Sequence, residues 1–380
     1  MPHNHQPTDR DLQTDQAAKD PELLVRQADP LNGGPPPNQL VEAFITPTAR
    51  FFVRSHAHAP VIDADAYTIR IDGLVERPQT LTLADLGGFP RHTITATLQC
   101  AGNRRDELLA LGPIPDELAW GSDAISTADW SGVRLSDLLA AAGARATAAH
   151  VAFLSHDLVH KHGQSFPFGA SIPLHKALAN EVLLADQMNG EQLPAIHGGP
   201  IRLIVPGYIG ARSVKWLAHI TLQTEPSANY FQTHAYKLFP PTTTAATVDW
   251  SDGMMLGELS VTSAICTPSD GCHLSPGPLR ISGYAMAGGD RTIERVEFSL
   301  DAGQTWQQAQ LGERKAWAWR FWEGMIELKP GMYQLMVRAW DSAANTQPAQ
   351  LAEVWNFKGY MNNAWHRIQL IVDSPTDPYQ

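Results

Sequence analysis

The sequence predicts an α+β domain followed by an all-β, immunoglobulin-like sandwich. Two observations lead to this prediction. Short strand-like and helix-like segments mix between about residues 40 and 235, and the composition changes near residue 250, after which helix signals largely vanish. The chain has 380 residues, of which 43% are hydrophobic and 18% charged, so it can form large cores and wholesale disorder is excluded. This length is typical of two or three domains.

The first region begins with a polar segment that ends in LNGGPPPN, which we interpret as a mobile or surface-laid arm. Alternating residues predict strands at 67–75 and 92–100, and the second of these ends at Cys100. The pattern of 134–143 predicts a helix that stops at Gly143. Further short apolar runs predict strands at 150–157, 181–186 and 201–207. They do not form an orderly βαβ series.

The second region is separated by LFPPTTTAATVDW, whose proline and threonine content is typical of a linker. About seven strand-like runs follow, joined by turns rich in glycine and aspartate, and seven of the eleven tryptophans lie between Trp306 and Trp365. This spacing favours a sandwich with a tryptophan-rich core. The expected division is therefore an arm over 1–38, a first domain over 39–237, a linker over 238–250 and a second domain over 251–375.

Charge and targeting signals narrow the function classes. Lys and Arg number 28 and Asp and Glu number 39, a net charge of −11, which argues against a general nucleic-acid binder. No apolar run of about 18 residues predicts a membrane span. The first residues lack a basic start, an apolar stretch and a cleavage site, so we expect a cytoplasmic protein, or a periplasmic one if an export signal has been removed.

Three cysteines are too few for a disulfide scaffold, and no C-x-x-C-H haem motif occurs. Cys266, Cys272 and His273 resemble part of a metal knuckle without its fourth ligand, so free thiols near strand ends are the simpler interpretation, and pairing of the two cysteines stays open. Histidines are concentrated in the segment SHDLVHKHG, which we interpret as a solvated loop rather than a zinc or copper site; they are His156, His160 and His162.

The segment TLQCAGNRRDEL is the most informative. Cys100 closes a strand, enters a Gly-Asn turn and is followed by two arginines. Nearby cations favour the thiolate, which is a nucleophile and a soft metal ligand, whereas a buried inert cysteine is the plain alternative. HGGPIRLIVPGYIGARSVKW adds basic residues among four glycines, a combination typical of an anion or phosphate cradle. It matches neither a Walker loop nor G-x-G-x-x-G.

Taken in order, the motifs resemble those of the molybdenum sulfite oxidase family, most of all its haem-free plant-type and bacterial members. The matching stretches are FFVRSH, TLQCAGNRR, HGGPIRLIVPG, GARSVKWL, AYKLFPP, DSAANTQP and VWNFKG, which span about residues 40–370. The resemblance implies a sulfite-oxidase-type molybdopterin domain followed by the sandwich. It also implies a molybdenum cofactor, no haem, and oxidation of sulfite to sulfate.

The resemblance also implies roles for individual residues. Cys100 would be the thiolate ligand of molybdenum. Anion-binding or catalytic positions would line the substrate pocket; they are Arg54, Arg105, Trp120, Tyr236 and Lys358. A second set would hold the pterin and its phosphate; it comprises His56, Asp157, His197, Arg202, Arg212, Ser213 and Lys215. Arg212 could equally serve packing.

One position departs from the family pattern. Lys358 stands in VWNFKGY where the family has an arginine, so the positive charge is kept but the bidentate fork is lost. A family member acting on another oxyanion, such as nitrate, is therefore an alternative. A non-catalytic scaffold is a more distant one, since Cys100 and the basic residues are all present.

The resemblance further implies partners. Because the segment before residue 40 is too short for a haem domain, electrons would pass to an external acceptor, either oxygen or a cytochrome. The second domain would mediate a symmetric homodimer.

Overall fold

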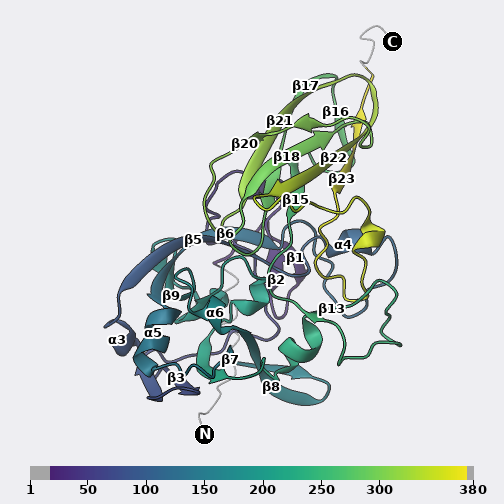
Figure 1. Cartoon of the computed structure of the whole chain (residues 1–380). Helices are drawn as coiled ribbons and strands as arrows, with labels where there is room; N and C mark the ends of the chain where they lie inside the picture. Colours follow the sequence, from purple (N-terminus) through teal and green to yellow (C-terminus); the bar gives the residue numbers. More distant parts are fainter. Residues whose placement is uncertain (1–17, 375–380) are drawn as a thin grey trace.

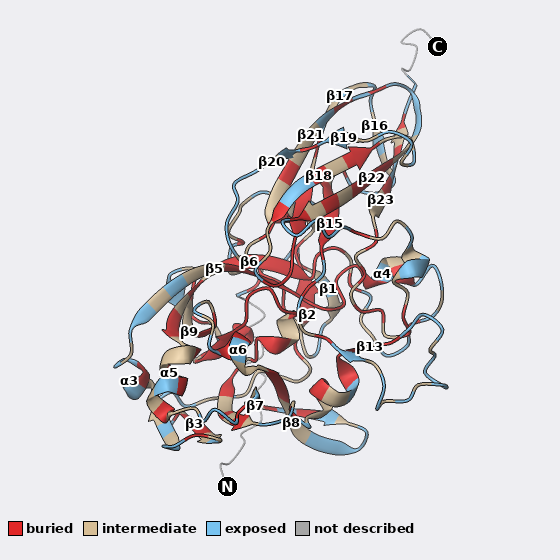
Figure 2. Cartoon of the chain, in the orientation of Figure 1, coloured by how far each residue is buried: buried red, intermediate tan, exposed pale blue. Residues whose placement is uncertain are grey.

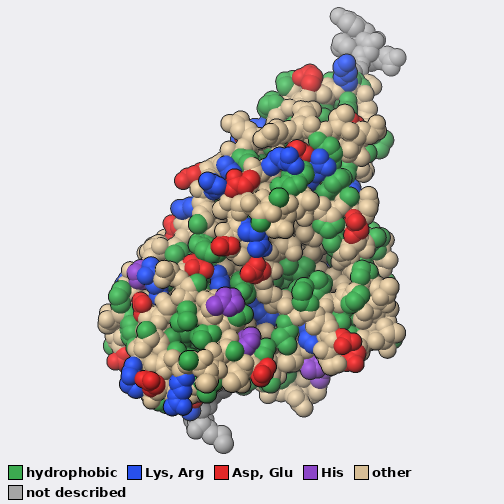
Figure 3. Space-filling model, viewed as in Figure 1, with side chains coloured by type: hydrophobic (Ala, Val, Ile, Leu, Met, Phe, Trp, Pro, Cys, Tyr) green, Lys and Arg blue, Asp and Glu red, His purple; other side chains and the backbone are tan. Residues whose placement is uncertain are grey.

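The computed structural model describes residues 18–374. Figure 1 shows two blocks of β-structure, a broad lower one and an elongated upper one, and few helices. The α+β class with an all-β second domain is thus confirmed. The face seen in Figure 3 intersperses acidic and basic side chains over both blocks.

The lower block contains two five-stranded sheets. One has the order β10-β9-β6-β5, with β11 also paired to β9, and the other has the order β4-β3-β12-β7-β8. The strands are β3 Thr68–Gly73, β4 Gln79–Thr82, β5 Arg91–Gln99, β6 Ile125–Arg134, β7 His150–Lys161, β8 Gln164–Pro173, β9 Leu183–Met188, β10 Glu191–Gln192, β11 Arg202–Ile204 and β12 Leu217–Gln223. Side chains from both sheets and from α5 share one hydrophobic core.

Helices are short in the described chain. The longest α-helix, α5 Leu135–Ala142, ends at Gly143 as expected and buries an i, i+3, i+4, i+7 stripe of Leu135, Leu138, Leu139 and Ala142. The remaining helical elements are single turns: α2 Pro37–Leu40, α3 Leu83–Leu86, α4 Arg105–Leu108, α6 Leu174–Ala177, η1 Ala195–His197, η2 Gly210–Arg212, the π-turn η3 Phe231–Ala235 and η4 Leu351–Glu353.

The upper block is a sandwich of two sheets, with orders β15-β17-β21-β20 and β16-β23-β22-β18-β19. Its strands are β15 Thr262–Thr267, β16 Cys272–Leu274, β17 Gly277–Met286, β18 Ile293–Ser299, β19 Gln307–Gln308, β20 Gln310–Leu311, β21 Arg320–Leu328, β22 Gly331–Asp341 and β23 His366–Val372. Branched aliphatic side chains and Trp322 fill the space between the sheets. Trp306 and Trp365 instead stack around Arg338 and are only half-buried.

Residues 18–38 of the expected polar arm are folded against the first domain. This segment forms a hairpin of β1 Leu24–Gln27 and β2 Asn32–Gly34, and Gly33 exchanges backbone hydrogen bonds with Val53. Asn32 is fully buried and Lys19 nearly so. Their polar groups bond to backbone carbonyls of the first domain, so a polar composition here reflects satisfied buried groups rather than solvation. Residues 1–17 of the expected arm lie outside the described residues.

The segment expected as a linker folds back on itself. β13 Lys237–Leu238 pairs with β14 Met254–Met255, and the buried Lys237 ammonium donates to the carbonyls of Trp250 and Asp252. The connection is therefore a closed loop.

The two blocks share a buried junction. Figure 2 shows buried residues running from β6 into β15, and one hydrophobic cluster contains residues of both blocks, among them Ala101, Tyr236, Tyr284 and Trp319. Arg104, which is fully buried, donates to the carbonyl oxygens of Ser263 at 3.0 Å and Ala364 at 2.8 Å. The turn after Cys100 is thereby attached directly to the second domain.

Candidate active site

Cys100 lies where β5 enters a tight turn. The backbone N–H of Cys100 donates to the Ala124 carbonyl, and the N–H of Gly102 points at the Cys100 sulfur at 3.4 Å. The residue is 7% exposed, and it lines a cavity whose empty volume, with its open mouth, is about 730 Å³.

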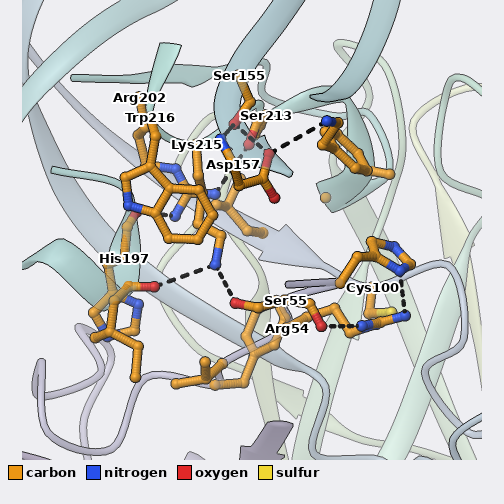
Figure 4. A pocket seen from close by; sticks show the side chains of 18 of the residues that line it. Arg54, Ser55, Cys100, Ser155, Asp157, His197, Arg202, Ser213, Lys215 and Trp216 are labelled. Carbon is orange, nitrogen blue, oxygen red and sulfur yellow. Dashed lines mark hydrogen bonds between the residues drawn. The ribbon is translucent and has the colours of Figure 1, made fainter. Parts of the chain in front are cut away.

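The cavity gathers most of the predicted site residues. Those that line it are Arg54, His56, Cys100, Asp157, His197, Arg202, Ser213, Lys215 and Tyr236. Figure 4 shows Cys100 near Arg54 on one side of the view and His197 with Arg202 on the other, with Lys215 between them. The site is therefore elongated, with the thiol toward one end and buried cations toward the other.

At the cationic end of the cavity, backbone carbonyl groups accept hydrogen bonds from Arg202 and Lys215 and hold these side chains in place. Arg202 donates through Nη1 to the carbonyl of His197 at 2.8 Å and through Nη2 to that of Ser213 at 3.1 Å, and its buried Nε has no partner. Burial lowers the pKa of Arg202 to about 9. Lys215 donates to the carbonyl of Ile196 at 3.2 Å and to the Ser55 hydroxyl. An anion placed here would offset this unfavourable burial of positive charge.

Gly198 allows the two cations to approach one another. Its φ is +109°, and a Cβ at this position would lie 2.9 Å from Cβ of Lys215 and 3.0 Å from Cβ of Arg202. A larger residue would be strained and would push these side chains apart.

Two histidines of the cavity are neutral at physiological pH. Burial, helped by the charges of Lys19, Arg202 and Lys215, holds the pKa of His197 well below its ordinary value. Burial likewise lowers the pKa of His56, and Arg54 contributes next. Neutral imidazoles can both donate and accept hydrogen bonds, which suits polar heterocycles such as a pterin.

The thiol end carries an arginine–histidine–tyrosine chain. Arg54 Nη2 lies 3.1 Å from His56 Nδ1, and His56 Nε2 lies 2.9 Å from the Tyr236 hydroxyl. Burial raises the pKa of Tyr236, so this residue stays a phenol that can donate a proton in a hydrogen bond. The three side chains therefore form one connected polar wall.

Asp157 is the acidic side chain among the residues that line the cavity. Its Oδ1 accepts from the Ser155 hydroxyl at 2.6 Å and from the Phe168 N–H at 3.3 Å. Burial raises the pKa of this carboxyl. A carboxyl of this kind suits the amino and ring N–H groups of a pterin.

Arg105 and Lys358 form a second group that adjoins the cavity without lining it. Arg105 donates to the carbonyls of Lys358, Gly359 and Leu118, and Glu117 sits against both cations. The link to the cavity is Tyr360, which lies under Arg105 and stacks on Tyr236 with ring centroids 5.3 Å apart.

Arg212 and Trp120 do not line the cavity. Arg212 donates through Nε to the carbonyl of Leu256 at 2.9 Å, so it ties the turn η2 to the segment before β15. Trp120 is fully buried in the hydrophobic cluster that includes Cys100 and Trp130. Each of them keeps a buried side-chain nitrogen without a hydrogen-bond partner, Nη1 of Arg212 and Nε1 of Trp120, so their expected contacts with cofactor and substrate stay predictions.

Three participants escaped the sequence analysis. Asn32 accepts from the Ser55 N–H at 2.8 Å and from Arg54 Nη1 at 3.3 Å. Lys19 places its ammonium 3.1 Å from His197 Nε2. Glu117 contacts Arg105 and Lys358. None of these three residues lies in one of the matching motifs. For Asn32, the local signal was the pair Gly33 and Gly34 that follows it in the sequence.

Other suggested metal positions are not assembled. Over residues 18–374, no group of three or more His, Cys, Asp or Glu side chains is placed to hold a metal ion. Cys266 and Cys272 are free thiols, and Cys266 is buried in the junction cluster. His160 bonds to Ser165, while His156 is half-buried and packs against Tyr67.

Comparison with known proteins identifies both blocks. Residues 56–231 match a family described as oxidoreductase molybdopterin binding domain, and residues 254–373 match one described as Mo-co oxidoreductase dimerisation domain. The human protein named mitochondrial sulfite oxidase is 43% identical over 95% of this chain and 68% of its own length. The Arabidopsis thaliana sulfite oxidase is 38% identical over 92% of this chain and 94% of its own.

One solved structure is similar to this chain over almost its whole length. The sulfane dehydrogenase SoxCD from Paracoccus pantotrophus superposes with a TM-score of 0.77 at 28% identity, covering 96% of this chain and 90% of the other. Two-block architecture and chain order are therefore shared.

Proposed function

The chain belongs to the molybdenum sulfite oxidase family, and from this we propose that it oxidises sulfite to sulfate at a molybdenum cofactor bound in the cavity. The observation that carries the proposal is that the Cys100 thiol opens into the same cavity as Lys215 and the buried Arg202, whose Nε has no hydrogen-bond partner. A soft ligand at one end and an anion cradle at the other match a metal-pterin phosphate.

The chain's residues fit this cofactor. Cys100 would bind molybdenum, and the unpartnered Nε of Arg202 together with Lys215 would meet the phosphate. His56, His197, Asp157 and Ser213 would hold the pterin through hydrogen bonds. When bound, the cofactor supplies the two-electron redox chemistry, and the protein orients and neutralises the reactants.

Substrate binding falls to the cationic side chains near the thiol. Arg54 and Tyr236 face the cavity and are positioned to hold an oxyanion through charge-assisted hydrogen bonds. Arg105 and Lys358 add positive charge from the adjoining group. Because Tyr236 stays a phenol, it donates its proton to the bound anion rather than competing with it.

Assembly and electron transfer complete the proposal. An external acceptor, oxygen or a cytochrome, takes the electrons, and no haem is required within residues 39–375.

The chain divides functionally into the first domain at 39–237, the connecting segment at 238–250 and a dimerisation domain at 251–375. A homodimer would have a mass of about 83 kDa, twice the 41.6 kDa chain. Over the described residues, no helix has the length and apolar character needed to cross a bilayer.

The test combines metal analysis with turnover. Purified protein is expected to hold about one molybdenum per chain and to oxidise sulfite with at least one of oxygen, ferricyanide and cytochrome c. Light scattering is expected to give the dimer mass. Full molybdenum content without sulfite turnover under all three acceptors would reject sulfite as the substrate and bring another oxyanion, such as nitrate, forward.

A further inference from the structure

Glu117 places a carboxylate between the two cations of the group next to the cavity. Its Oε1 forms an ion pair with the Lys358 ammonium, and its Oε2 lies 3.4 Å from Arg105 Nη2. The side chains are 10% exposed for Glu117, 15% for Lys358 and 3% for Arg105. This is therefore a largely desolvated cluster, in which one unit of charge has large consequences.

The remaining donors of Arg105 are committed to the backbone. Nε is shared by the carbonyls of Lys358 and Gly359, and Nη1 donates to the Leu118 carbonyl at 2.8 Å. Gly359 has φ of +60°, and a Cβ there would lie 2.7 Å from Cγ of Arg105, so the guanidinium is held in one orientation. Nη2 is the guanidinium nitrogen that remains for a ligand, and the Glu117 carboxylate occupies that position.

The cluster reaches the cavity through stacked aromatic rings. The guanidinium of Arg105 lies 4.9 Å from the centre of the Tyr360 ring, and Tyr360 stacks on Tyr236, which lines the cavity. A charge on Glu117 is thus close to the wall that an oxyanion would contact.

We infer that Glu117 is a specificity-determining residue: its carboxylate occupies the anion position between Arg105 and Lys358, so an anionic substrate must compete with it. A carboxylate attached to the protein competes at a high effective concentration. Weakly bound anions lose this competition, whereas an anion with more charge wins it more readily. The inference rests on the proposed function, because that proposal assigns Arg105 and Lys358 to substrate binding.

The effect of removing the charge has a definite sign. Glu117→Gln keeps the shape and hydrogen-bonding capacity of the side chain but frees the positive charge of its partners. Binding of sulfate, the dianionic product, should tighten about tenfold or more, and inhibition by chloride should strengthen as well.

The measurement is calorimetric titration of sulfate into the holoenzyme, with chloride competition. Glu327→Gln is the matched control, because it makes the same change of net charge on an exposed position of β21 in the sandwich. Its sulfate affinity should stay within about twofold of wild type, as expected for a distant exposed charge. Thermal unfolding confirms that each variant is folded.

A charge-balanced pair of variants tests whether Glu117 acts through Lys358. Lys358→Gln alone should weaken sulfate binding about tenfold, and the double variant Glu117→Gln/Lys358→Gln should return to within about threefold of wild type. Sulfate binding by E117Q that is equal to or weaker than that of wild type overturns the inference. If wild type fails to oxidise sulfite while the E117Q gain in sulfate binding persists, the proposed reaction fails and this assignment stands.

Discussion

The side-chain amide of Asn103 donates a 2.9 Å hydrogen bond to the hydroxyl of Tyr284, which lies on β17 of the second domain. The Tyr284 hydroxyl in turn donates to the Ser122 carbonyl at 3.0 Å, and Asn103 Oδ1 accepts from the Ala124 N–H at 3.0 Å. All these groups are buried. The position of the loop that presents Cys100 therefore depends on a tyrosine of the sandwich.

Replacing Tyr284 with Phe should lower the free energy of unfolding by about 1–3 kcal/mol, because the Asn103 amide and the Ser122 carbonyl lose a buried partner. Urea unfolding measures this change. Tyr333→Phe is the control, since its hydroxyl bonds to an exposed backbone segment at Lys329, and its effect should stay within about 0.5 kcal/mol. Equal effects of the two variants would contradict the proposed coupling of the loop to the second domain.

Cys100→Ser should abolish sulfite oxidation and leave the fold intact. A hydroxyl is a harder and less acidic donor than a thiol, so it is a poor substitute as a molybdenum ligand. Steady-state assays and circular dichroism test the two halves of the prediction. Cys272→Ser, at a half-buried free thiol on β16, is the control and should keep its activity. Turnover like that of wild type in Cys100→Ser would remove Cys100 from the site.

Arg54→Gln should raise the KM for sulfite by about 10- to 150-fold, which corresponds to about 1.5–3 kcal/mol for one charge-assisted contact. Asn32→Ala should shift KM in the same direction by a smaller factor, because Asn32 orients Arg54. The comparison to make is KM against kcat in both variants. A fall in kcat with an unchanged KM would assign Arg54 to the reaction step rather than to substrate binding.

Lys19 predicts a specific pH dependence of stability in cofactor-free protein. Burial lowers its pKa from 10.5 to about 7 in the folded chain. Between these values the unfolded chain binds more protons, so the Lys19 contribution makes stability rise with pH, by at most about 1.4 kcal/mol per pH unit.

Lys19→Met should remove that contribution, so the stability difference between wild type and variant should change between pH 7 and pH 9. Chemical unfolding at the two pH values measures it. Bound cofactor phosphate would favour the charged ammonium and flatten the wild-type dependence. A difference that is the same at both pH values in cofactor-free protein would show that the ammonium is not desolvated as the contacts of Lys19 indicate.

Residues within contiguous motifs could be predicted from the sequence, and residues joined across it could not. Cys100, Arg54 and Lys215 lie in stretches whose residue types and order already suggest a metal ligand and an anion cradle. Asn32 and Lys19 reach the site through hydrogen bonds to residues far along the chain, and no local pattern encodes these contacts. Arg212 and Trp120 have suitable chemistry, but their surroundings also include contacts that serve packing, to the Leu256 carbonyl and within the cluster around Trp130, which the sequence does not show.

The hydrogen bonds from Arg104 to Ser263 and Ala364 have a consequence for exchanging domains between related proteins. Both acceptors are main-chain carbonyls, so these hydrogen bonds do not depend on which side chains occupy positions 263 and 364. A second domain transplanted from a relative could differ widely in sequence and still seat the cysteine turn, provided that its backbone follows the same path. A single inserted residue near either carbonyl would displace the acceptor and misplace the Cys100 thiol, although no residue of the cavity itself had changed.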